Sequence, residues 1–130
     1  MAKGLKDLIV DARRTASELS PEEAKALIDE GALVLDVREP KEFGQGRIAG
    51  ARNVPRGMLE LRAAADSPVA DAELTGRPDQ QLFVYCTKSP SARSLLAAQT
   101  LASLGYENVK VIDGGLNAWA EAGFATEEGS

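Results

Sequence analysis

The chain of 130 residues contains no histidine and only one cysteine, Cys86. A single cysteine cannot form an internal disulfide. Without histidine, a zinc site built from the usual cysteine and histidine ligands is excluded. We therefore expect neither a metal nor another cofactor. A lone thiol stays free in a reducing compartment, so we expect a cytoplasmic protein.

The sequence also lacks an excess of basic residues and any long hydrophobic run. It has 15 Lys and Arg against 20 Asp and Glu, a net charge of −5. Nucleic-acid binding depends on many basic contacts to phosphate, so it is not expected. No apolar run reaches transmembrane length, so no membrane association is expected either. With 44% apolar and 27% charged residues, the composition is typical of one globular domain.

Hydrophobic spacing predicts the first helices. Apolar residues recur at helical intervals over residues 5–14, which predicts an amphipathic N-terminal helix. A second helix is expected to begin after Ser20, because Ser20-Pro21-Glu22-Glu23 combines an N-cap serine, a proline at the first position and a glutamate at the third. This helix is expected to end at Gly31.

Short apolar runs later in the chain predict a parallel sheet. A strand buried on both faces of such a sheet is apolar throughout. The run 82–85 fits this description, and the largely apolar runs 33–37 and 109–112 are the other predicted strands. Residues 64–81 have weak periodicity and are expected to form a loop with one helical turn. Asp113-Gly114-Gly115 is expected to form a tight turn, after which a last helix runs through Trp119 to Gly123.

The run 82–85 stops at Cys86. A helical pattern that ends at Gly105 follows soon after, with its apolar residues expected on one face: Leu96, Ala97, Leu101 and Leu104. Cys86 is therefore predicted in a loop between the carboxyl end of a strand and the amino end of a helix. The first N–H groups of a helix lack partners and favour anions. Lys88 and Arg93 add positive charge, so we expect the loop to stabilise a thiolate and to hold an anionic substrate. A buried, inert cysteine is the alternative.

Asp36 lies at the end of the predicted strand 33–37, where a buried acid needs a hydrogen-bonding or ionic partner. We predict that Asp36, Arg38 and Glu39 support the site structurally and take no part in catalysis. Arg56 begins a short predicted helix. It is either a surface charge or a substrate contact.

Four segments, taken in order, resemble the rhodanese family of sulfurtransferases: 35–43 (LDVREPKEF), 46–55 (GRIAGARNVP), the Cys86 loop and 113–119 (DGGLNAW). The resemblance implies an α/β fold, a three-layer sandwich with about five mainly parallel strands and helices on both faces. It places a rhodanese-like domain at residues 15–123, after the N-terminal helix in residues 1–14. Residues 124–130 are expected to be a flexible tail.

The same resemblance implies an activity. Rhodanese-like enzymes move sulfane sulfur from a small anionic donor such as thiosulfate to cyanide, a thiol or a protein acceptor, through a persulfide on the catalytic cysteine. Cys86 would be that cysteine, and Lys88 matches the Cys-x-Lys arrangement of relatives that use thiosulfate. The candidate substrate-binding residues are Thr87, Lys88, Ser89, Ser91, Ala92, Arg93 and Arg56. A monomer or a homodimer is expected.

The Cys86 loop departs from the usual Cys-x4-Arg pattern of the family. Arg93 follows after six residues, the loop has no glycine, and Pro90 contributes no N–H. Either the pocket is enlarged, or the helix starts earlier, with Ser91 ending the loop and Arg93 one turn into the helix. Phosphatases and arsenate reductases of this fold use Cys-x5-Arg, so such an enzyme is one alternative. A non-catalytic binding or redox-sensing module is another.

Overall fold

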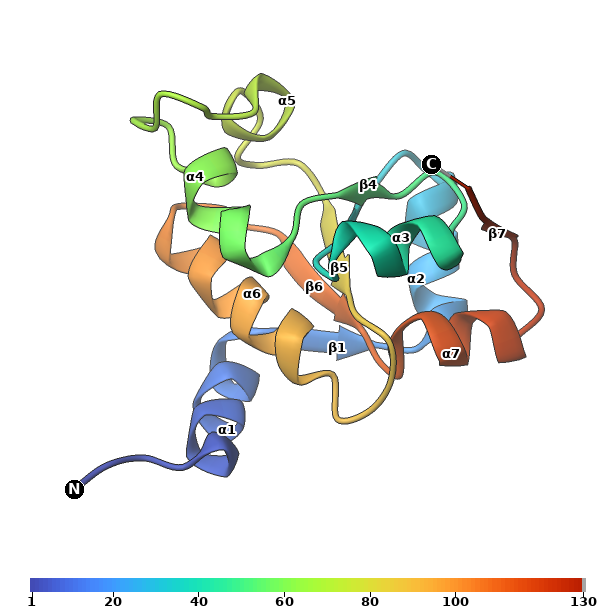
Figure 1. Ribbon diagram of the computed structural model, residues 1–130, viewed down its shortest axis with the longest axis horizontal. Coiled ribbons are helices and arrows are strands. Elements are labelled where there is room, and N and C mark those ends of the chain that lie inside the picture. The colour runs from blue at the N-terminus through green and yellow to red at the C-terminus, as the bar shows by residue number, and fades with distance from the viewer. Residues whose placement is uncertain (130) are drawn as a thin grey trace.

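The computed structural model describes residues 1–129 and centres on a five-stranded sheet (Figure 1). The strand order is β1-β6-β5-β2-β4, and every neighbouring pair is parallel. In chain order the strands are β1 (Ser17–Leu19), β2 (Leu33–Asp36), β4 (Arg52–Asn53), β5 (Leu82–Tyr85) and β6 (Val109–Ile112). The expected α/β fold is confirmed.

Helices cover both faces of the sheet, as Figure 1 shows. The buried clusters assign one face to α1 (Leu5–Thr15), α4 (Leu59–Ala63), α5 (Ala72–Thr75) and α6 (Ala92–Ser103). The other face is covered by α2 (Pro21–Asp29) and α7 (Gly115–Glu121). The short helix α3 (Pro40–Gln45) follows β2, and a 3₁₀ turn, η1 (Arg56–Met58), follows β4. No helix within residues 1–129 has the length and apolar character needed to cross a bilayer.

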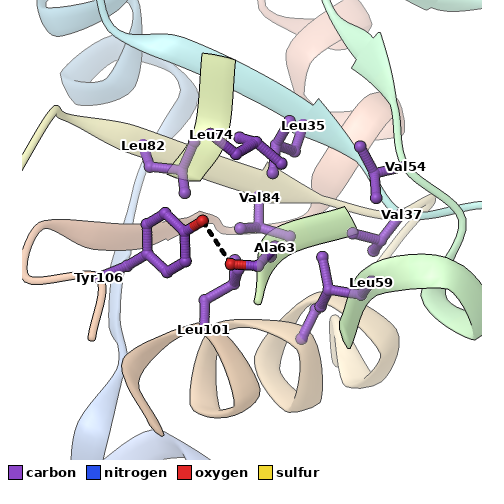
Figure 2. Close-up of a cluster of buried hydrophobic side chains, with 11 residues drawn as sticks. Leu35, Val37, Val54, Leu59, Ala63, Leu74, Leu82, Val84, Leu101 and Tyr106 are labelled. Carbon is purple, nitrogen blue, oxygen red and sulfur yellow. Dashed lines mark hydrogen bonds between the residues drawn. The ribbon is translucent and has the colours of Figure 1, made fainter. Parts of the chain in front are cut away.

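Strand β5 lies at the middle of the sheet and is buried at all four positions. Leu82 and Val84 point into the cluster drawn in Figure 2, which lies between the sheet and helices α4 and α6. Phe83 and Tyr85 belong to the opposite cluster, with Trp119 of α7. Because side chains alternate along a strand, an entirely apolar run fills both layers at once. Cys86, the residue after β5, therefore lies at the end of the central strand of the sheet.

Helix α6 is buried on two faces, where we expected one. Ala97 and Leu101 contact the cluster of Figure 2 as predicted, but Leu95 and Ala98 are also buried, against α1. The prediction is wrong for Leu104, which is 36% exposed. Leu104 is the C-cap residue of α6. The chain turns away from the helix at the next residue, Gly105, which has φ +98°.

The C-terminal residues also differ from expectation. We predicted a flexible tail at 124–130, but β7 (Thr126–Glu127) pairs with β3 (Arg47–Ile48) in an antiparallel ladder. The ring of Phe124 lies edge-on to Trp119, with centroids 5.0 Å apart. The indole N–H of Trp119 donates to the carbonyl of Ala125 at 2.9 Å. These contacts hold the segment in place, and Ser130 lies outside the described residues.

The two leucines of α6 allow a matched test of this packing. Leu101 is fully buried and Leu104 is 36% exposed. We expect Leu101→Ala to lower the free energy of unfolding by about 2–5 kcal/mol, because it removes buried methyl groups and leaves a cavity. Leu104→Ala should cost less than about 1 kcal/mol. Urea unfolding of both variants measures the difference, and equal losses would contradict the assigned helix faces.

Candidate active site

Cys86 follows β5 directly and is only 3% exposed. Its carbonyl oxygen accepts a hydrogen bond from the N–H of Leu116 at 2.9 Å. The next carbonyl, of Thr87, accepts one from Asn117 at 3.0 Å. The backbone at the cysteine is therefore held from one side by β5 and from the other by the start of α7.

Gly115 makes this close approach possible. A Cβ at this position would lie 2.4 Å from the carbonyl oxygen of Cys86, and the backbone has φ +57°. Both the contact and the dihedral angle exclude ordinary side chains. The Asp113-Gly114-Gly115 turn predicted from the sequence therefore allows α7 to begin directly against the cysteine.

Helix α6 begins at Ala92, with Ser91 as its N-cap residue at φ +62°. The second of the two arrangements left open by the sequence is therefore nearer to the structure: Ser91 ends the loop, and Arg93 lies in the first turn of α6. The N–H of Ser91 donates to the carbonyl of Lys88 at 2.9 Å, which closes the loop. The hydroxyl of Ser91 is buried and has no hydrogen-bond partner within residues 1–129.

A pocket of about 200 Å³, here called the cysteine pocket, opens over this loop. Its lining consists of Cys86, Thr87, Lys88, Ser89, Pro90, Ala92 and Arg93. The structure thus brings the cysteine together with the predicted loop residues except Ser91, which is completely buried. Arg56 is not in this lining. It donates to Glu60 at 3.0 Å and to Thr100 at 3.0 Å, on a more distant turn of α6.

The loop presents unpaired backbone donors. The N–H groups of Thr87, Lys88 and Ser89 donate to no backbone or side-chain acceptor among the described residues. The same holds for Ala92 and Arg93 in the first turn of α6, as helix geometry requires. Because these residues line the cysteine pocket, their N–H groups are available to an anion bound there.

The two cations of the loop have different surroundings. Arg93 forms a bidentate ion pair with Glu42, at 2.8 and 3.1 Å, and also donates to the hydroxyl of Thr87 at 3.2 Å. The hydrogen bond from Arg93 lowers the pKa of Glu42 from its ordinary 4.5 to about 2. Lys88 is exposed and makes no ion pair within the described chain. Arg93 therefore braces the loop, and Lys88 is the cation in the pocket lining that remains available to an anionic ligand.

Ser94 is a site residue for which the sequence analysis proposed no role. It is completely buried, and its hydroxyl lies 3.4 Å from the sulfur of Cys86 and donates to the carbonyl of Ser91 at 3.0 Å. Helical spacing from Ala97 and Leu101 puts position 94 on a buried face, so the pattern contained a signal for its burial. Glu42 was missed as well, and here no local signal exists, because its partner is 51 residues away.

Asp36 and Arg38 form a buried network behind the loop. The guanidinium of Arg38 donates to both carboxylate oxygens of Asp36, and the hydroxyl of Tyr85 donates to the same carboxylate at 2.6 Å. Burial and this bond to Asp36 raise the pKa of Tyr85. The amide of Asn53 donates to the carbonyls of Asp36 and Arg38. Glu39 is exposed at the start of α3 and makes no ion pair among residues 1–129.

Two glycines test the contact beneath the cysteine. Gly115→Ala should lower the free energy of unfolding by more than about 2 kcal/mol, because the new Cβ collides with the backbone of Cys86. A Cβ added at Gly57 would meet no atom within 4 Å, and the φ angle there is not positive, so Gly57→Ala should be nearly neutral. Equal stability of the two variants in denaturant titrations would contradict the role given to Gly115.

The ion pair between Glu42 and Arg93 predicts a pH dependence. The folded-state pKa of Glu42 is lowered from 4.5 to about 2, so its stabilisation is complete above the unfolded pKa and is lost as the pH falls from about 5 towards about 2. Both side chains are partly exposed, at 35% and 42%, so Glu42→Gln should cost only about 0.5–1 kcal/mol at pH 7.

The measurement is the free energy of unfolding of both proteins across this pH range. The difference between them should shrink as the pH falls. Glu121→Gln is the control, because Glu121 is exposed and makes no ion pair within residues 1–129. A difference that grows towards low pH would refute the assignment.

Comparison with known proteins agrees with this geometry. The rhodanese-like domain family matches residues 20–122. The thiosulfate sulfurtransferase GlpE of Pseudomonas entomophila is 38% identical over 101 residues, which cover 78% of this chain and 82% of that protein. Thiosulfate sulfurtransferase 16, chloroplastic, of Arabidopsis thaliana is 34% identical over 92% of this chain and 99% of its own length.

A solved structure is similar over almost the whole chain. The protein RPA3614 of Rhodopseudomonas palustris, described as a possible tyrosine phosphatase of unknown function, superimposes with a TM-score of 0.87 at 32% identity, covering 98% of this chain and 96% of its own. Since the family match spans most of the chain and includes β5, the Cys86 loop and α7, the protein belongs to the rhodanese-like domain family.

Proposed function

We propose that the protein is a sulfurtransferase that carries sulfane sulfur on Cys86. The observation that carries the proposal is the position of this thiol, the only one in the chain, in a pocket lined by Lys88 and by unpaired N–H groups. The relatives named as thiosulfate sulfurtransferases support the same activity. We also propose a reducing compartment such as the cytoplasm, where such a thiol stays free.

The reaction consists of two displacements. The Cys86 thiolate attacks the outer sulfur of thiosulfate, the sulfur–sulfur bond of the donor breaks, and sulfite leaves with the bonding electron pair. The acceptor, cyanide or a thiolate, then attacks the outer sulfur of the persulfide and releases the Cys86 thiolate. Sulfite is a weak base and leaves without a proton, so the site needs no general acid.

The lining supplies what these steps require. Lys88 binds the sulfonate oxygens of thiosulfate by charge-assisted hydrogen bonds. The unpaired N–H groups of the loop stabilise negative charge on the persulfide. Ser89 is a candidate hydroxyl donor to the same charge, whereas the predicted role of Ser91 is not retained, because its hydroxyl is buried outside the lining. The hydroxyl of Ser94, 3.4 Å from the sulfur, positions it. Thr87 and Ala92 contribute pocket wall, and Arg93 keeps the loop in shape through Glu42. Asp36 and Arg38 form the buried network behind the loop and support the end of β2.

A phosphatase is the second candidate, favoured by the description of the R. palustris neighbour. Phosphate-ester cleavage benefits from a general acid that protonates the leaving group. No Asp or Glu lines the cysteine pocket in the described chain, which argues against this reading. Turnover of an aryl phosphate or reduction of arsenate, lost in Cys86→Ser, would support it over sulfur transfer.

Mass spectrometry of the intact protein tests the proposal. After incubation with thiosulfate, the mass should rise by one sulfur atom, and cyanide should remove that atom. Cys86→Ser should show neither change. A wild-type protein that stays unmodified at millimolar thiosulfate, with its thiol still free, would refute sulfur transfer and leave the phosphatase and the non-catalytic binding or redox-sensing module as alternatives.

Lys88 can be tested by kinetics. Lys88→Ala is expected to raise KM for thiosulfate about tenfold, equivalent to a loss of roughly 1.4 kcal/mol of charge-assisted binding. Lys88→Arg should recover most of the loss. Lys6→Ala removes an exposed lysine of α1 outside the pocket lining and serves as the control. An unchanged KM in Lys88→Ala would contradict its assignment to the donor.

A further inference from the structure

We infer that Arg13, on the N-terminal helix α1, is a positioning residue for the Cys86 loop. The inference rests on the proposed sulfurtransferase function and deepens it, because it names a residue outside the cysteine pocket that holds the donor-binding part of the loop in place. Three observations support it: a hydrogen bond from Arg13 to the loop, an ion pair that orients Arg13, and the packing of α1 against α6.

The two halves of the Cys86 loop are held differently. The carbonyls of its first two residues accept hydrogen bonds from the start of α7. Residues 88–90 have one hydrogen bond to another element within the described chain: Nη2 of Arg13 donates to the carbonyl of Pro90 at 3.4 Å. This half of the loop carries Lys88, the cation in the pocket lining that is available to a donor. The contact that holds it therefore comes from the other end of the sequence.

An ion pair sets the direction of the Arg13 guanidinium. Nε donates to the carboxylate of Glu18 at 2.7 Å, and the Glu18 side chain is 20% exposed. Glu18 lies in β1, where its backbone is paired with that of Val111 in β6. Because the guanidinium is planar and rigid, the bond at Nε fixes where Nη2 points. The carbonyl of Pro90 is thereby connected through Arg13 to the edge strand of the sheet.

The packing of α1 fixes the backbone of Arg13. Ala12, the preceding residue, is completely buried, and Ala16 on the next turn is buried as well. Both belong to one apolar cluster with Leu95 and Ala98 of α6. Since α6 begins directly after the Cys86 loop, this packing holds Arg13 at a set position relative to the end of the loop.

A longer loop needs more contacts to keep one conformation. Arg93 follows Cys86 after six residues, where the usual family pattern has four, and each added residue increases the conformational entropy that ordering the loop must overcome. Helix α1 lies outside residues 20–122, which match the family. The extra loop residues are thus contacted by a helix that the family match does not include.

Arg13 does not line the cysteine pocket, so it acts on the donor only through the loop. Without its bond to Pro90, residues 88–90 are free to sample other conformations. Lys88 and the unpaired N–H groups of Lys88 and Ser89 then face the donor in a smaller fraction of the molecules, which lowers the apparent affinity. We expect weaker binding of thiosulfate and of any other anion in this pocket.

Steady-state kinetics tests the positioning role. Arg13→Ala should raise KM for thiosulfate about threefold, the net effect of losing one modest hydrogen bond. Arg13→Lys keeps the charge but cannot bind Glu18 and Pro90 together in the same geometry, so it should show the same rise. Arg14→Ala is the matched control, because Arg14 is exposed on the same helix and bonds only Asp11 within residues 1–129. An unchanged KM in Arg13→Ala, or a normal KM in Arg13→Lys, would overturn the inference.

Alkylation of Cys86 gives a second readout that needs no sulfur transfer. Iodoacetate and iodoacetamide react with the same thiolate, but only iodoacetate is an anion. The ratio of their two rates therefore reports how well the pocket holds an anion. This ratio should fall about threefold in Arg13→Ala and in Arg13→Lys, and stay constant in Arg14→Ala.

The two readouts separate the inference from the proposed function. If thiosulfate fails to load Cys86 in the wild-type protein, sulfur transfer fails, and the alkylation ratio alone decides whether Arg13 positions the loop. A ratio that is equal in the wild type, Arg13→Ala and Arg13→Lys would overturn the inference whether or not sulfur is transferred.

Discussion

The site depends on one backbone contact: the carbonyl of Cys86 against the first residues of α7. The N–H of Leu116 binds this carbonyl, and Gly115 lies so close that a Cβ would collide with it. On the other side, β5 is buried at every position between two apolar clusters. The backbone of Cys86 is therefore held by contacts on both sides. Cys86 is buried, while Lys88 and Ser89 in the same loop are exposed.

The charged side chains around Cys86 have two different roles. Some form ion pairs that hold the backbone in position, and one remains available to a ligand. Arg93 is neutralised by Glu42, and Arg38 by Asp36, so both pairs mainly hold backbone in position. What remains for a bound anion is Lys88 and the row of unpaired N–H groups. Backbone N–H dipoles and one exposed cation suffice for a reaction whose leaving group needs no proton.

Much of this was predictable from the sequence, because local patterns specify local structure. Apolar runs predicted β2, β5 and β6, and the capping residues around Ser20 predicted α2. The position of Cys86 at a strand end followed from the same patterns. Strand β1 was missed, because its three residues form a strand only through pairing with β6. β7 and the partnership of Glu42 with Arg93 depend on long-range contacts that no local pattern records. The second buried face of α6 was missed because the packing of α1 creates it.

The central claim is that the thiol at the end of β5 accepts sulfur as an anion. The most direct measurement is a single turnover without acceptor, in which protein is mixed with excess thiosulfate and the sulfite released is quantified. We predict one equivalent of sulfite per chain and none from Cys86→Ser. Release of no sulfite by the wild-type protein, or equal release by the serine variant, would contradict this claim.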